Sequence, residues 1–296
     1  MVDESTRFDH LDGTARIAAL AALQARVVVN LVVAVAIFVS WAALAAMAIG
    51  NAQVGLPAES LPGDMLLRWL PDLPIPDWAG RFVALCLTPA TTSASVTANL
   101  LFMWLMWTLM AVAMMLPSAA PMIRTYCEIA DTACAKSEAA VHPLVLVAGY
   151  LVVWVVASAA FAAVSVLVQS RAGAPVIGYA AVAALGVAGL YQFSGLKEAC
   201  LKKCRNPFAI LFSRWSSRPS RIFRLGVEQG VWCLGCCWAL MLVMFAVGTM
   251  NIFWMALMGV FAVVEKQTSG RFPTRLAGAI LLVWATALLL VSGLRA

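Results

Sequence analysis

Histidine and charged side chains are scarce in this sequence. Only two histidines occur, His10 and His142, and charged residues make up 11% of the 296 positions. Two histidines are too few for a histidine-rich iron or zinc catalytic centre, so that class of site is excluded. A soluble domain carries about 25% charged residues, so the low charge also argues against a soluble protein.

Several nucleotide and catalytic motifs are missing as well. The sequence has no glycine-rich phosphate loop, no serine-nucleophile elbow and no acid–base constellation that names a reaction. We therefore make no prediction of an enzyme, and any transport would have to proceed without an ATP-binding motif in this chain. The net charge of +6 is better explained by membrane topology than by nucleic-acid binding.

A cleaved signal peptide is not expected either. The first 26 residues mix acidic and basic side chains, and the first apolar run, residues 27–49, is too long for the core of a signal peptide. We interpret residues 1–26 as a cytoplasmic N-terminal tail.

What the sequence has in excess is apolar surface. Hydrophobic residues make up 63% of the chain, above the roughly 45–50% of soluble domains, and the surplus must face lipid. The prediction is an all-α, polytopic transmembrane helix bundle over residues 27–296, with the lipid bilayer as its main partner. Its seven predicted spans are residues 27–49, 98–116, 143–168, 176–193, 227–248, 252–264 and 275–290.

Two connecting segments stand out between these spans. Residues 50–97 contain six prolines, which predicts an extracytoplasmic connecting loop. The alternative is that this loop, or the helix faces, forms a docking surface for a protein partner. Residues 195–226 read as a basic cytoplasmic loop, whose charges fit topology and contact with anionic headgroups.

The distribution of basic residues supports this topology. With the N-terminus inside, 16 of the 20 lysines and arginines fall on cytoplasmic segments and 4 outside. Cytoplasmic segments carry such an excess of basic residues in membrane proteins. We therefore expect a multi-pass protein of a bacterial inner membrane.

The most informative stretch begins the fifth predicted span. Cys233, Cys236 and Cys237 are at i, i+3 and i+4, so one helix face carries all three thiols, and Met241 and Met244 extend that face. Soft sulfur ligands gathered in this way suit Cu(I), zinc or an iron–sulfur cluster. We predict Cu(I) first and zinc second, because both thiolate and thioether groups lie along the helix.

A second set of sulfur atoms lies on other segments. Cys200 and Cys204 are at i and i+4 after the fourth span, on the same predicted membrane side as Cys233. Met110 and Met114 belong to a methionine stripe in the second span, which either packs adaptably or contacts Cu(I). Pro117 and Pro121 follow this stripe and are expected to end or kink the helix.

The predicted topology places these groups at the same depth, at the cytoplasmic face of the membrane. Five thiols are expected to converge there with two carboxylates, Glu228 and Glu265, as neighbours. The predicted function is soft-metal handling or transfer at the cytoplasmic face. Two alternatives stay open: an assembly or scaffold subunit whose cysteines only pack, and a membrane thiol–disulfide oxidoreductase using vicinal cysteines.

These residues also carry a family resemblance. The sequence resembles a bacterial family of predicted metal-binding integral membrane proteins of unknown function. The matching stretches are Trp107 to Pro117 with Pro121, Tyr191-Gln192 with Lys197, Cys200-Leu201, Cys204-Arg205, Gly230 to Met241, and Glu265-Lys266. The resemblance covers the second to the sixth predicted span and implies metal binding without naming a mechanism.

Overall fold

The computed structural model describes residues 25–53, 96–136, 138–171, 174–247 and 251–293. Over these residues the chain is all-α, without a strand, as predicted. Most of the predicted tail (1–26) and of the predicted proline-rich loop (50–97) lies outside the described residues.

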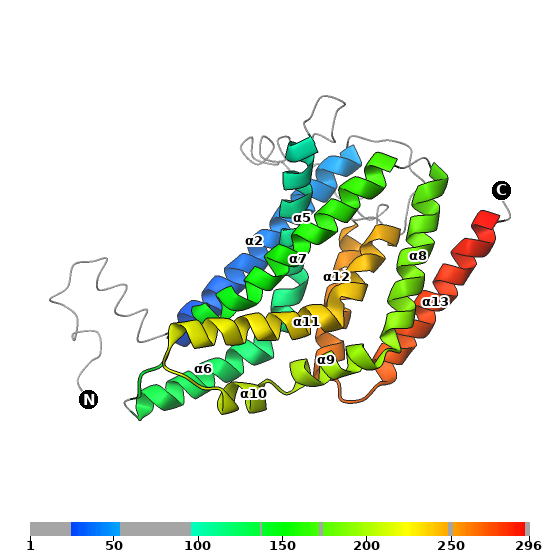
Figure 1. Cartoon of the computed structure of the whole chain (residues 1–296). Coiled ribbons are helices and arrows are strands. Elements are labelled where there is room, and N and C mark those ends of the chain that lie inside the picture. Colours follow the sequence, from blue (N-terminus) through cyan, green and yellow to red (C-terminus); the bar gives the residue numbers. More distant parts are fainter. Residues whose placement is uncertain (1–24, 54–95, 137, 172–173, 248–250, 294–296) are drawn as a thin grey trace.

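Seven helices form the body of the molecule and fall on the seven predicted spans. In Figure 1, α2, α5 and α7 lie together on one side, α8 and α13 lie on the other, and α11 crosses between them, packed against α7 and α8. The helices are α2 (Ala25–Gln53), α5 (Val96–Ser118), α7 (Leu144–Arg171), α8 (Ala174–Gln192), α11 (Pro219–Val247), α12 (Ile252–Gln267) and α13 (Phe272–Gly293).

Five of these helices, α2, α5, α7, α11 and α13, are by themselves long and apolar enough to cross a membrane. A sixth candidate is α8 together with the short helix α9 (Gly195–Arg205), which is bent from it by 66°. Helix α12 has 16 residues, fewer than the roughly 20 that a full crossing needs. Seven spans and a cytoplasmic N-terminus therefore stay predictions.

The outward faces of the long helices are strongly apolar. On α2, Phe38 is 74% exposed, and Leu31 and Val35 beside it are exposed as well. A contiguous apolar surface of this kind marks contact with lipid or with another protein. It agrees with the excess of hydrophobic residues in the sequence.

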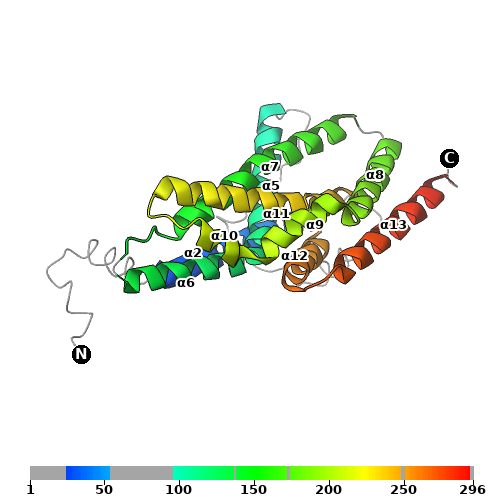
Figure 2. The ribbon, with the colours of Figure 1, turned by 60° about the horizontal axis from the view of Figure 1, so that its bottom comes forward.

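Short helices close one end of the bundle. The helices α6 (Ala120–Ala135), α9 and α10 (Pro207–Ser213) lie together at the lower end of Figure 1 and come forward in Figure 2. The segment predicted as a basic cytoplasmic loop, residues 195–226, contains α9, α10 and the start of α11, and its cytoplasmic location stays a prediction. Helix α9 forms because Ser194 caps it, accepting a hydrogen bond from the Lys197 backbone N–H at 3.1 Å. Helix α11 begins at Pro219, before the predicted start of the span at residue 227, because proline suits a first helical turn.

The prolines of the second span act as predicted. Helix α5 ends at Ser118, one residue after Pro117, and α6 begins at Ala120 with Pro121 in its first turn. Near this break the Met115 carbonyl oxygen accepts hydrogen bonds from the Ser118 hydroxyl and from Tyr150 of α7, and the Ser118 hydroxyl accepts one from Lys266 of α12.

Two glycines let α7 and α11 touch through their backbones. A Cβ atom on Gly226 would lie 2.1 Å from the Leu146 carbonyl oxygen, and one on Gly149 would lie 2.2 Å from the Phe223 carbonyl oxygen. Small residues of this kind allow membrane helices to approach closely. The approach fixes the position of α11, and with it the position of the three cysteines.

Substitution of Gly226 by alanine is expected to destabilise the fold by about 2 kcal/mol, because the new methyl group meets backbone that cannot rotate away. Thermal unfolding of the detergent-solubilised chain, followed by circular dichroism, measures this loss. Gly186→Ala in α8 is the matched control, because no atom of another described helix lies within 4 Å of its Cβ position. Equal unfolding temperatures for the two variants would contradict the close approach.

Candidate metal centre

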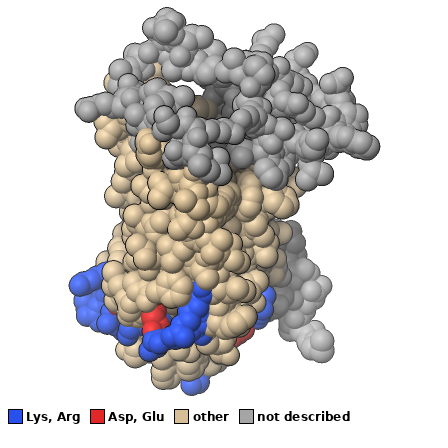
Figure 3. All heavy atoms as spheres, turned by 90° about the vertical axis from the view of Figure 1, so that its right-hand side faces the viewer, with Lys and Arg blue, Asp and Glu red and all other residues tan. Residues whose placement is uncertain are grey.

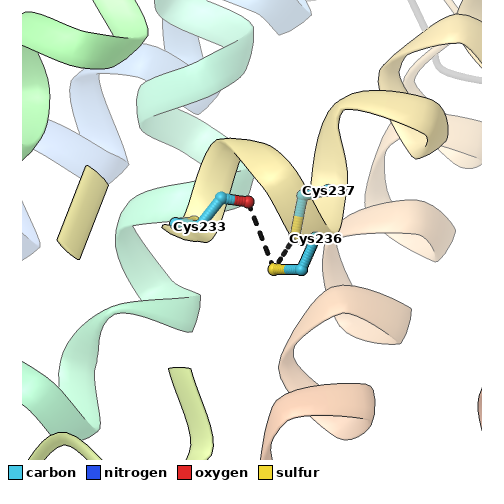
Figure 4. Close-up of side chains that lie close together, drawn as sticks. All are labelled: Cys233, Cys236 and Cys237. Carbon is cyan, nitrogen blue, oxygen red and sulfur yellow. Dashed lines mark hydrogen bonds between the residues drawn. The ribbon is translucent and has the colours of Figure 1, made fainter. Parts of the chain in front are cut away.

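The three cysteines of α11 form a compact, buried group. Cys233, Cys236 and Cys237 are buried, and their Sγ atoms all lie within 4.8 Å of one another. Cys236 Sγ is 3.3 Å from Cys237 Sγ and donates to the Cys233 carbonyl oxygen at 3.2 Å (Figure 4). The spacing i, i+3, i+4 places them together because one helical turn takes 3.6 residues.

The two cysteines of α9 meet this group from the side. Cys204, half-buried, has its Sγ 3.8 Å from Cys236 Sγ. Cys200 is buried against the α11 backbone, where a Cβ atom on Gly235 would lie 2.6 Å from Cys200 Sγ. The two segments therefore converge, although Cys200 lies outside the compact group of three.

A lysine that sequence reasoning assigned to a cytoplasmic loop lies inside this site. Lys266, at the end of α12, is buried and donates to Cys233 Sγ at 3.0 Å and to Ser118 Oγ at 2.7 Å. Tyr150 of α7 contacts the same sulfur at 3.0 Å and donates to the Met115 carbonyl oxygen. An ammonium group at this distance stabilises negative charge on the sulfur, as a metal-binding thiolate requires.

The predicted carboxylate neighbours have basic partners instead. Glu265 is 0% exposed and its Oε1 lies 2.9 Å from Nζ of Lys197, which is also 0% exposed. This contact lacks hydrogen-bond alignment, so it is an attraction between charges, and Glu265 Oε2 has no hydrogen-bond partner in the described part of the chain. Glu228 forms an ion pair with Arg214 and is 30% exposed. Neither carboxylate belongs to the thiol group.

The four methionines named from the sequence are all buried in the core. Met241 and Met244 follow Cys237 by about one and two turns of α11, and Met110 and Met114 lie in the last turns of α5. Met114 packs against α12 at Gly259, whose Cβ position is 3.6 Å away. Burial of this kind suits packing and thioether ligation equally, so their role as ligands stays a prediction.

A cavity of about 200 Å³ lies beside two of the thiols, those of Cys204 and Cys233. Its lining includes the buried Cys233, the half-buried Cys204 and the exposed Pro121 and Gln267. Within the part of the chain that the structure describes, the charged side chains of this lining are two cations, Arg205 and Lys266, and no carboxylate joins them. Of the three buried thiols of α11, Cys233 therefore borders a cavity with a basic lining, whereas Cys236 and Cys237 lie behind it.

Comparison with known protein families agrees with this site. A family model described as PpoB2, copper chaperone, matches residues 104–288. The chain belongs to this copper chaperone family. The matched region runs from within α5 to within α13 and contains every residue of the site described above. Searches of the curated proteins and of the solved structures found no match.

Sequence reasoning found the thiols of this copper chaperone family member, but it did not predict that Lys266 contacts one of them or that Lys197 pairs with Glu265. Lys197 and Lys266 were counted among the charges that set topology, yet the structure buries both. Their position in the sequence could have indicated burial. Each lysine lies next to an apolar segment and within one helical turn of a cysteine or a glutamate. A lysine that continues a helix beyond an apolar run can be drawn into the core when a buried anion lies across from it.

The two cysteines of α6, Cys127 and Cys134, differ in their exposure to solvent. Cys127 is buried and Cys134 is exposed. Burial beside Asp131 raises the pKa of the Cys127 thiol. Neither cysteine belongs to the compact thiol group of α11, so α6 supplies control positions for experiments on the site.

Proposed function

We propose that this protein is an integral membrane copper chaperone that holds Cu(I) on the thiolates of Cys233, Cys236 and Cys237 and passes it to a partner. The observation that carries the proposal is the compact group of three buried thiols within a chain of the copper chaperone family. Soft thiolate donors favour Cu(I) over the harder divalent metals.

The sulfur positions fit a metal of this size. A metal–sulfur bond of about 2.3 Å implies sulfur atoms about 4 Å apart in a three-coordinate site, compared with at most 4.8 Å within the group and 3.8 Å between Cys204 and Cys236. Histidine is absent from the group, and three thiolates with Cu(I) leave a net negative charge that Lys266 offsets. Zinc, which prefers four ligands, would need Cys204 as the fourth and is the alternative cargo.

Cys204 is the residue suited to pass the metal in and out. It lines the cavity, is the least buried of the thiols at the site, and has its sulfur 3.8 Å from Cys236. A Cu(I) ion held by Cys204 and a donor thiolate can move to Cys236 as one sulfur replaces another, without leaving sulfur coordination. The basic lining favours Cu(I) arriving as an anionic thiolate complex rather than as a free cation.

The membrane setting is part of the same proposal. Five helices, and a sixth as a bent pair, are apolar and long enough to cross a bilayer. We place the chain in a bacterial inner membrane, with the N-terminus and the basic end in the cytoplasm. The thiol cavity then opens toward the cytoplasm, where a reducing environment keeps the cysteines as thiols.

A Cu(I) competition experiment tests this function. Full-length protein in detergent, kept anaerobic and reduced, is titrated with Cu(I) against a chromogenic chelator. We expect one tightly bound Cu(I) per chain, and weaker binding of zinc in a parallel titration. Cys204→Ser is expected to keep this stoichiometry but to slow removal of Cu(I) from the chelator about tenfold, equivalent to about 1.4 kcal/mol in the barrier.

Cys134→Ser is the matched control, because Cys134 is exposed on α6 and is absent from the cavity lining. Its rate should equal that of the unchanged protein. If the protein takes no Cu(I) from the chelator, the chaperone function is wrong. If Cys204→Ser transfers Cu(I) as fast as the control, the entry route is wrong.

A further inference from the structure

A second cavity, of about 290 Å³, lies where the break between α8 and α9 meets the first turn of α13. Among the described residues its lining contains no cysteine, and Arg205 is the one residue that it shares with the lining of the thiol cavity. Figure 3 looks onto this side of the molecule and shows basic side chains gathered around a carboxylate at the lower end.

The charge of this lining is strongly positive. Among the described residues, the lining holds one carboxylate, that of Glu198, and four basic side chains, those of Lys202, Arg205, Arg271 and Arg275. The Arg205 guanidinium also donates to the Glu265 carbonyl oxygen. Glu198 forms ion pairs with Lys202, at 3.3 Å, and with Arg271. Within the described residues the Arg275 side chain has no ion-pair partner. The excess of cations at one cavity favours a bound anion.

The walls of the cavity also hold polar groups without partners. Gln192 is 3% exposed, and neither atom of its side-chain amide has a hydrogen-bond partner among the described residues. The Thr274 hydroxyl, in a residue that is 7% exposed, has none there either. Buried polar groups in folded proteins are nearly always hydrogen-bonded, so two such residues in one cavity wall point to a ligand.

We propose that this cavity binds a phosphate group. Guanidinium groups match phosphate oxygens with paired hydrogen bonds, and the amide of Gln192 and the hydroxyl of Thr274 supply further donors. The same chemistry would recognise the phosphodiester of a membrane lipid headgroup or a free phosphate ion. Its place at the basic end of the bundle suits a headgroup of the inner leaflet.

The test is a binding titration on the full-length protein in neutral detergent. The probes are short-chain phosphatidylglycerol and inorganic phosphate. We expect saturable binding that weakens about tenfold or more in Arg271→Gln/Arg275→Gln, because each lost charge-assisted hydrogen bond costs about that factor. The control is Arg221→Gln/Arg224→Gln, which removes two exposed charges of α11 that lie outside the cavity lining.

The two sources of phosphate give different results. Saturable lipid binding that inorganic phosphate does not displace identifies a headgroup site, whereas binding of inorganic phosphate alone identifies a site for the free ion. Either supports the proposal if only the cavity variant is weakened. Absence of saturable binding by both probes, or equal weakening in the two double variants, would overturn it. Neither result depends on copper binding.

Discussion

A chain in which Cys233, Cys236 and Cys237 are all replaced by serine is expected to lose tight Cu(I) binding. A serine hydroxyl is a hard donor that does not replace a thiolate toward Cu(I). The three sulfur atoms are the compact donor group of the structure, so we expect the affinity to fall by at least about a thousandfold, or ~4 kcal/mol. Competition against a chromogenic Cu(I) chelator measures this loss.

The control for this variant is Cys127→Ser/Cys134→Ser on α6, which removes thiols that the structure places away from the α11 group. Serine is close to cysteine in size, and its hydroxyl can bond to a helical carbonyl one turn back, so the triple variant should fold. Circular dichroism and elution volume verify that it does. Full copper content in a folded triple variant would show that these three cysteines are not the ligands.

The same variant separates the remaining hypotheses for the chain. If the chain is a scaffold subunit, its assembly would be unchanged by loss of the thiols, and it would purify without metal. A thiol–disulfide oxidoreductase would show a thiol pair that titrates reversibly with redox potential. Both stay predictions, and the copper titration distinguishes them from the chaperone function.

The second large effect is expected at the buried ion pair of α9 and α12. Replacing Lys197 by methionine leaves the carboxylate of Glu265 in the core without its cation, and both side chains are 0% exposed. Removal of one partner of a buried pair costs about 3–5 kcal/mol. We expect this loss in the free energy of unfolding, measured by denaturant titration of the detergent-solubilised protein.

Two further variants show whether the loss comes from the unpaired charge. Lys197→Met/Glu265→Gln removes both charges and should recover most of the stability. Glu228→Gln breaks the partly exposed pair with Arg214 and should cost less than about 1 kcal/mol. A double variant that is as unstable as Lys197→Met alone would show that packing, rather than the uncompensated charge, is the cause.

Local features of the fold were predictable from the sequence. The excess of apolar residues predicted an all-α bundle, and each of the seven predicted segments became a helix. The spacing of Cys233, Cys236 and Cys237 placed three sulfurs on one face, since helical geometry fixes neighbours within two turns. Pro117 and Pro121 likewise marked the break between α5 and α6.

The partners of these groups depended on how the helices pack. The contact of Lys266 with Cys233 and the pairing of Lys197 with Glu265 each join separate helices, and neither was predicted. Such contacts depend on where helix axes cross, and close crossings here are set by single glycines such as Gly226 and Gly235. Sequence spacing determines which side chains share a face of one helix. The predicted topology placed the cysteines of two segments at one depth, but only the tertiary structure decides which buried charge on another helix lies across from them, because this depends on where the helix axes cross.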